Sequence, residues 1–242
     1  MTAAAAPDPR YRWVIAIASA LILAVAMGQL VNGWSAFLVP LEVHFGWSRA
    51  AVSGINSAGL IGIALGGIVM GFVADRLSIR WIGLIGATAI PLATLVAARA
   101  SELWQFYTLF FLAGAVGGGA LFAPIIATVG GWFRTGAGLA IGIASAGQAV
   151  GQGLVPFLLG HLIEALGWQA ALTVLGAVTA LALVPLSLLL RPPSPAPAPA
   201  MPARSAAAAA GPAQAPALSP WLVLPALSLA VLGCCTGMAV PL

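Results

Sequence analysis

The chain has 242 residues, of which 62% are hydrophobic, with only nine Lys or Arg and five Asp or Glu. Charged residues make up 6% of it, against about 25% in a soluble domain, so a soluble surface is excluded for most of the chain. The formal charge of +4 comes from single arginines scattered between apolar stretches. This pattern lacks the basic cluster that a nucleic-acid partner requires.

Seven stretches without Asp, Glu, Lys or Arg follow one another along the chain. About 20 apolar residues in a helix cross the hydrocarbon core of a bilayer, and these stretches are continuously apolar rather than alternating, so they predict helices. The first is longer than the about 7–15 residues of a signal-peptide core, which is the alternative for that segment. The predicted spans are 14–39, 51–74, 81–98, 103–129, 136–163, 170–190 and 221–242.

The arginines predict the orientation in the membrane. When the loops are numbered alternately from the N-terminus, Arg49 and Arg99 fall in one set and the other seven arginines in the other. Because cytoplasmic loops retain Lys and Arg, the N-terminus is predicted to be cytoplasmic. The lack of Lys and the abundance of Ala, Gly, Pro and Arg indicate a GC-rich bacterial genome, and hence a bacterial inner membrane. The larger set is Arg10, Arg12, Arg76, Arg80, Arg134, Arg191 and Arg204.

A segment rich in Pro and Ala divides the chain. Residues 191–219 bury no apolar surface and are predicted to be a semi-rigid or disordered cytoplasmic linker. The expected organisation is a cytoplasmic tail (1–12), a six-span bundle (13–190), this linker, and a seventh span (220–242) that begins a second bundle. Cys234 and Cys235 are adjacent in the seventh span, which favours packing over a disulfide or a metal site.

The chain contains a short internal echo. Gly46-Trp47-Ser48-Arg49 precedes the second span, and Gly131-Trp132-Phe133-Arg134, 85 residues later, precedes the fifth. A Ser-Ala-Gly triplet follows inside each of the two spans, at 57–59 and 145–147. Three spans separate the copies, so the second copy is inverted, as in the three-plus-three repeats of transporters. Chance similarity between helices rich in Gly and Ala is the alternative.

Four amides lie inside predicted spans, where they must find hydrogen-bond partners. Gln29 and Asn32 are three residues apart in the first span, and Gln148 and Gln152 are four apart in the fifth, so each pair is expected to share a helix face. They either bond neighbouring helices or line a cavity that binds a polar solute. Pro156 and Pro124 are expected to break their helices locally, where a neighbour or cavity satisfies the freed carbonyls. Glycines at four-residue spacing predict close helix packing, at Gly62/Gly66, Gly67/Gly71, Gly114/Gly118, Gly138/Gly142 and Gly147/Gly151.

The loop between the second and third spans carries Gly71, Asp75, Arg76 and Arg80. One carboxylate and two guanidiniums can form a charge-assisted network, and the alternative is a loop that only fixes orientation. The segment resembles the cytoplasmic loop motif of the major facilitator superfamily, although Ser78 stands where that motif has Gly and Ile79 where a basic residue is common. The resemblance implies that these four residues gate the conformational switch.

A second resemblance concerns the branch of that superfamily. The segment 45–53, after Gly28-Gln29 and Pro40-Leu41, and the segment 132–147 resemble bacterial members of the monocarboxylate and oxalate–formate branch, over nearly all of 13–190. This implies an all-α membrane fold with a six-helix N-terminal bundle, and transport of a small organic anion by alternating access, as in an antiporter. It also implies that the first span lines the cavity, which favours Gln29 and Asn32. Ser48 is predicted to cap the second helix, and Trp47 and Trp132 suit the membrane interface.

Several features are absent from the sequence. No nucleophile–base pair, metal-ligand spacing or phosphate loop is present, so no catalytic residue, metal or cofactor is predicted. His44 and His161 are interpreted as loop residues rather than proton relays. None of the spans contains a charged residue, and in the resembling branch the substrate-pairing cations lie on C-terminal helices. We therefore expect a truncated chain whose partners are the lipid bilayer, a small solute and the absent C-terminal half of the transporter. The alternatives are drug efflux, a non-transporting membrane protein and, least favoured, an intramembrane enzyme.

Overall fold

Six apolar helical spans, each long enough to cross a bilayer, make up the part of the chain that the computed structural model describes, residues 11–74, 76–133 and 136–192. Most of their ends lie within a few residues of the ends of the six predicted spans. The first span is longer than its predicted range of 14–39 at both ends. The predicted all-α fold is therefore confirmed. The tail to residue 10, Asp75, Arg134, the linker beyond Pro192 and the predicted seventh span lie outside the described residues. The spans are Tyr11–Phe45, Arg49–Ala74, Ile79–Ala97, Leu103–Trp132, Ala137–Leu166 and Trp168–Leu189.

Spans 1 and 4 are composite helices. Span 1 consists of α1 (Tyr11–Met27), the π-helix η1 (Gly28–Asn32), the 3-10 helix η2 (Gly33–Phe37) and α2 (Leu38–Phe45). Span 4 consists of α5 (Leu103–Leu112), the π-helix η3 (Ala113–Gly118) and α6 (Gly119–Trp132). The other spans are single helices: α3 (Arg49–Ala74), α4 (Ile79–Ala97), α7 (Ala137–Leu166) and α8 (Trp168–Leu189).

Local chemistry sets the helix ends. The Ser48 hydroxyl accepts a hydrogen bond from the backbone N–H of Ala51 at 3.3 Å, so its predicted capping role is confirmed. Glu102 and Gln105 form a capping box at the start of α5. Gly167 is the single residue between α7 and α8, and its φ of +81° lies in a region that residues with a side chain rarely adopt. This glycine lets two long spans join through one residue.

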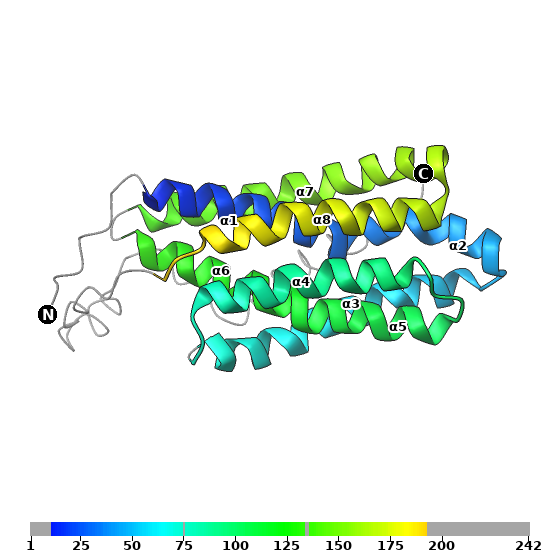
Figure 1. The fold of residues 1–242 in the computed structure, drawn as a ribbon, viewed down its shortest axis with the longest axis horizontal. Helices are drawn as coiled ribbons and strands as arrows, with labels where there is room; N and C mark the ends of the chain where they lie inside the picture. Colours follow the sequence, from blue (N-terminus) through cyan, green and yellow to red (C-terminus); the bar gives the residue numbers. More distant parts are fainter. Residues whose placement is uncertain (1–10, 75, 134–135, 193–242) are drawn as a thin grey trace, which may run out of the picture. The chain divides into compact units, whose positions relative to one another are not determined.

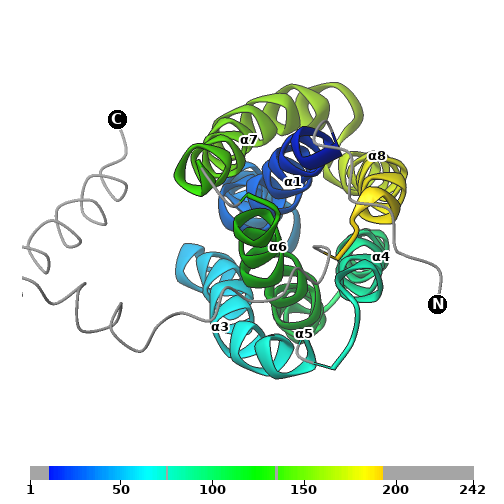
Figure 2. The same cartoon turned by 90° about the vertical axis from the view of Figure 1, so that its left-hand side faces the viewer.

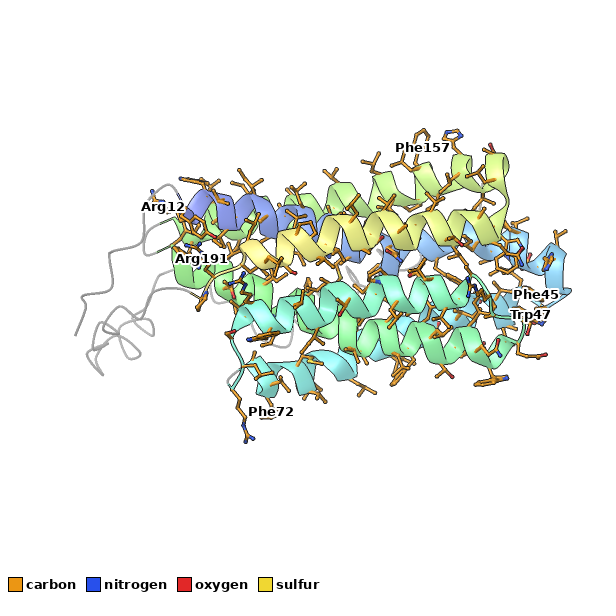
Figure 3. All side chains as sticks on the ribbon, in the orientation of Figure 1. Arg12, Phe45, Trp47, Phe72, Phe157 and Arg191 are labelled. Atoms are coloured by element: carbon orange, nitrogen blue, oxygen red, sulfur yellow. The ribbon has the colours of Figure 1, made fainter. Side chains whose placement is uncertain are left out.

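The bundle has a central pair of spans. Viewed along the spans, α1 and span 4 lie in the middle, with α7 beside α1 and α3 beside span 4, while α4 and α8 pack together on the other side (Figures 1 and 2). Large apolar side chains cover the outside, including Phe72 and Phe157, which point away from the bundle (Figure 3). A soluble protein would not expose this much apolar surface, whereas a bilayer solvates it.

Glycines allow two close helix crossings. A Cβ atom on Gly151 of α7 would overlap the carbonyl oxygen of Ala24 in α1, and one on Gly66 of α3 would overlap that of Ala115 in span 4. The predicted packing role is therefore confirmed for Gly62/Gly66, Gly114/Gly118 and Gly147/Gly151. A Cβ atom on Gly67, Gly71, Gly138 or Gly142 would meet no described atom within 4 Å, so a packing role for these two pairs stays a prediction.

The π-helices follow the register of the internal echo. The segments η1 and η3 begin at Gly28 and Ala113, the same 85-residue offset that separates the two Gly-Trp tetrapeptides. Each π-helix lies in the first span of its three-span unit, and each unit's first span crosses the second span of the other unit at glycines. These two agreements favour the inverted repeat over chance similarity.

Candidate functional site

Gln29 lies at a buried junction of three spans. It is 3% exposed, its Nε2 donates to the Thr94 hydroxyl of α4 at 2.6 Å, and its Oε1 accepts from the Thr179 hydroxyl of α8 at 2.8 Å. The Thr94 hydroxyl in turn donates to the carbonyl oxygen of Ile90 at 2.9 Å. Both functions of the amide are thus engaged by neighbouring helices. The helix-bonding interpretation accounts for these contacts, and a cavity role for Gln29 stays a prediction.

Asn32 contacts a different helix. Its Nδ2 donates at 3.2 Å to the backbone carbonyl oxygen of Gln152 in α7. That oxygen would normally accept from the residue four positions later, which is Pro156 and has no N–H. Asn32 therefore supplies the donor that Pro156 removes. The expected local break is wrong for both prolines, because α7 continues through Pro156 and α6 through Pro124.

Gln29 and Asn32 do not share a helix face, contrary to the expectation from their spacing. The reason is the π-helix Gly28–Asn32, which contains both residues. A π-helix bonds from residue i to i+5, so it has more residues per turn than an α-helix and separates residues three apart more widely around its axis. Gln29 is thereby directed towards spans 3 and 6, and Asn32 towards span 5.

Gln148 and Gln152 lie one turn apart on α7, beside the glycine stripe that contacts α1. Both residues are half-buried, as is Asn32. Neither side-chain amide makes a hydrogen bond to another residue of the described part of the chain. Asn32 and Gln152 are neighbours through the bond described above. The structure therefore places Asn32 beside the backbone of Gln152, one turn from Gln148, and assigns Gln29 other partners.

An aromatic cluster occupies the end of the bundle that carries Phe45 and Trp47 (Figure 3). Trp34 is buried, donates from Nε1 to the Val52 carbonyl at 3.3 Å, and its ring centroid lies 4.1 Å from that of Phe110. Phe45 and Trp47 stack at 4.2 Å with an interplanar angle of 7°. The cluster joins spans 1, 2, 4 and 6 at this end. The separate apolar runs gave no indication of it, since its members are far apart in the sequence.

The two histidines lie at the same end. The expectation that they are loop residues is wrong, because His44 is in α2 and His161 in α7. His161 is 3.8 Å from the carboxylate of Glu164, and both side chains are largely exposed. The imidazole of His44 packs edge-on against Trp168, with centroids 5.3 Å apart. Neither histidine lies at the middle of a span, where a proton relay through the membrane would need one.

The loop motif lies at the opposite end, beside a cavity. Gly71 is half-buried near the end of α3, Arg76 and Arg80 are exposed, and the backbone N–H of Arg76 donates to the carbonyl of Val73 at 3.0 Å. Asp75, the acidic member, is outside the described residues. The cavity has a volume of about 330 Å³ and is lined by Ala74, Leu77, Ser78, Ile79, Ile82, Pro124, Ala127, Thr128 and Pro192.

Comparison with known proteins identifies the family. The family model of the Major Facilitator Superfamily matches residues 17–242. The chain belongs to this superfamily. Six apolar helices and this membership make it an integral membrane protein with a transporter fold, in a family whose members are transporters and not, in general, enzymes.

Three curated relatives cover most of the six-span unit. The gallate transporter of Pseudomonas putida is 32% identical over 195 residues, which are 78% of this chain and 41% of the relative. Human monocarboxylate transporter 11 is 31% identical over 186 residues, 77% of this chain and 39% of the relative. An uncharacterized MFS-type transporter of Bacillus subtilis, YcxA, is 27% identical over 180 residues, 74% of this chain and 44% of the relative. The chain thus spans less than half the length of these relatives.

Proposed function

We propose that the chain contributes the first of two bundles of a secondary transporter that carries a small organic anion by alternating access. The observation that supports this proposal most strongly is that similar proteins are named as transporters of carboxylates. One is named for gallate and another for monocarboxylates, and gallate is itself an aromatic monocarboxylate. A solute with one carboxylate is therefore the substrate class that the relatives support best.

We assign the contribution of this bundle to the substrate site to Asn32, Gln148 and Gln152. These residues are half-buried where η1 of span 1 contacts α7, and amide N–H groups donate to carboxylate oxygens. Gln29 is assigned a positioning role, because both ends of its amide are bonded to Thr94 and Thr179.

The charge of the substrate requires a partner that these spans do not supply. No Asp, Glu, Lys or Arg occurs in 13–41, 50–74, 81–98, 103–133, 135–163 or 165–190. An anion at membrane depth is stabilised by a cation, and we assign that cation to the second bundle. This assignment agrees with relatives that are more than twice the length of the region matched.

We further propose that the loop with Gly71, Asp75, Arg76 and Arg80 gates the conformational change, and that this end faces the cytoplasm of a bacterium. The support is the resemblance of the loop and the excess of arginines at this end. The cavity beside the loop leaves room for its residues to move relative to α6.

Uptake into proteoliposomes tests the proposal. Labelled lactate, oxalate and gallate would be offered to this chain and to the chain extended through the reading frame that follows residue 242. We expect uptake of a carboxylate by the extended form, loss of that uptake in Gln148→Leu/Gln152→Leu, and retention in the matched control Gln169→Leu at the exposed end of α8. A correctly folded extended form that takes up none of the three compounds would refute the assigned substrate class.

A further inference from the structure

The ends of three spans meet in an aromatic cluster at the end of the bundle opposite Trp47. Tyr11 and Trp13 lie in the first turn of α1, Trp132 ends span 4, and Phe133 directly follows it. The Tyr11 and Trp132 rings lie 5.7 Å apart, and Trp13 meets Phe133 edge-on at 5.2 Å. We call these four residues the Tyr11 cluster. Figure 3 shows Arg12 and Arg191 at this same end of the bundle.

Both arginines lie on rings of the Tyr11 cluster. The guanidinium carbon of Arg191 is 4.7 Å from the centroid of the Tyr11 ring, and that of Arg12 is 5.4 Å from the Phe133 centroid and 6.0 Å from the Trp13 centroid. Cation–π contacts of this kind hold a guanidinium in place while leaving its N–H groups free to donate.

The polar groups of the cluster rings are engaged by the protein itself. The Tyr11 hydroxyl donates to the carbonyl of Leu189 at 2.7 Å, and Trp132 Nε1 donates to the carbonyl of Arg191 at 2.9 Å. The first bond satisfies a carbonyl at the C-terminal end of α8, which has no partner within the helix, and the second engages a carbonyl two residues beyond that end. They also fix the backbone of Arg191 against spans 1 and 4.

The guanidiniums, in contrast, have open donors. Within residues 11–74, 76–133 and 136–192, neither arginine forms an ion pair with a carboxylate, and Arg12 Nε is buried without a hydrogen-bond partner. The described carboxylates, on Glu42, Glu102 and Glu164, belong to the other end of the bundle. Two guanidiniums therefore lie at the same end of the bundle with no carboxylate partner among the described residues.

The position of the cluster indicates what binds there. Tyr and Trp collect at the level of the lipid headgroups, and the Tyr11 cluster lies where three membrane spans begin or end. A phosphate matches a guanidinium through two parallel hydrogen bonds. We propose that Arg12 and Arg191 form a binding site for the phosphate of an anionic phospholipid headgroup. The site is separate from the amides of the transport site and does not depend on the substrate.

Native mass spectrometry of the full chain in a neutral detergent tests the site. The protein would be titrated with phosphatidylglycerol and with phosphatidylcholine, and the bound fraction measured at each concentration. We expect tighter binding of phosphatidylglycerol, and a loss of about fivefold for Arg12→Gln or Arg191→Gln alone and about thirtyfold for both together. The control Arg49→Gln/Arg99→Gln removes the same charge at the other end and should change the affinity less than about twofold.

Further measurements distinguish a lipid-headgroup site from a general charge effect and from a site for free anions. Arg12→Lys/Arg191→Lys keeps the charge but loses the planar donor pair. Its affinity for phosphatidylglycerol should therefore lie between those of the unmodified protein and the double Gln variant. Inorganic phosphate at the concentration of the lipid should displace none of it; displacement would show a free-anion site and overturn the proposal. The proposal would also be overturned if the two double Gln variants lost the same affinity for phosphatidylglycerol, or if the Arg12/Arg191 variant lost none. If the Gln variant fails to fold, equal affinity of the unmodified protein for both lipids decides against the site.

Discussion

Replacing Gln29 with Leu tests whether this amide joins helices. Leu has a similar size and no polar atoms, so the change removes the bonds to Thr94 and Thr179 without opening a large cavity. A side-chain hydrogen bond between membrane helices contributes about 0.6 kcal/mol on average and at most about 1.7 kcal/mol. The Thr94 hydroxyl keeps its bond to the Ile90 carbonyl, and that of Thr179 can turn to a carbonyl of its own helix, which limits the penalty. We expect a loss of about 1–2 kcal/mol in the free energy of unfolding.

A double-mutant cycle isolates the bond itself. Unfolding in mixed micelles would be followed for Gln29→Leu, Thr179→Val and the double variant, and a coupling energy of about 0.6 kcal/mol or more is expected. Gln148→Leu is the matched control, because that amide bonds no described residue, and it should change the stability by less than about 0.5 kcal/mol. Additive effects, with a coupling below about 0.3 kcal/mol, would show that the junction does not hold the three spans together.

Three further predictions concern span crossings and the loop. Asn32→Leu leaves the Gln152 carbonyl without a donor and should lower the free energy of unfolding in mixed micelles by about 1–3 kcal/mol. Pro156→Ala in the same background restores a backbone N–H and should recover much of that loss. No recovery would contradict the assigned role of the bond from Asn32 to Gln152. Gly151→Ala forces a Cβ atom against the Ala24 carbonyl of α1 and should lower the free energy of unfolding by about 1–3 kcal/mol. Gly138→Ala has open space around it and should leave that free energy unchanged or raise it by up to about 1 kcal/mol. Equal effects of the two substitutions would refute the close contact between α7 and α1 at Gly151. Asp75→Asn in the extended transporter should reduce uptake by about tenfold or more at unchanged expression, and uptake at the unmodified rate would exclude a gating role.

The sequence was sufficient to predict the spans because a bilayer imposes one simple requirement. Charges are excluded from about 20 consecutive residues in each span, so the charge-free stretches locate the helices. The first span extends beyond its predicted limits, to Tyr11 and Phe45, because the helix continues through the aromatic residues at each interface. Ser48 was identified as a cap because it immediately precedes an apolar helix, a signal that is local in sequence.

The directions of the amides were not predictable in the same way. Gln29 and Asn32 differ in direction because η1 is a π-helix, and nothing in the residues Gly28–Asn32 distinguishes that segment from an ordinary α-helical turn. The partners of Gln29, Thr94 and Thr179, lie 65 and 150 residues away in the sequence. Nothing in the sequence distinguishes these two threonines from others in apolar spans. By contrast, the glutamines of α7 keep their four-residue relation, because that helix is regular between them.

The bond from Asn32 to α7 has a mechanical consequence. A proline inside a helix normally creates a hinge, since the segments on either side lose the hydrogen bond that braces them. In α7 the missing brace at Pro156 is replaced by one from another helix, so the freedom of the hinge is tied to the π turn of span 1. A bend of α7 at Pro156 that moves Gln152 away from span 1 must break this bond. We therefore expect such a bend to be coupled to η1 by about 0.6 kcal/mol, the average for a hydrogen bond between membrane helices.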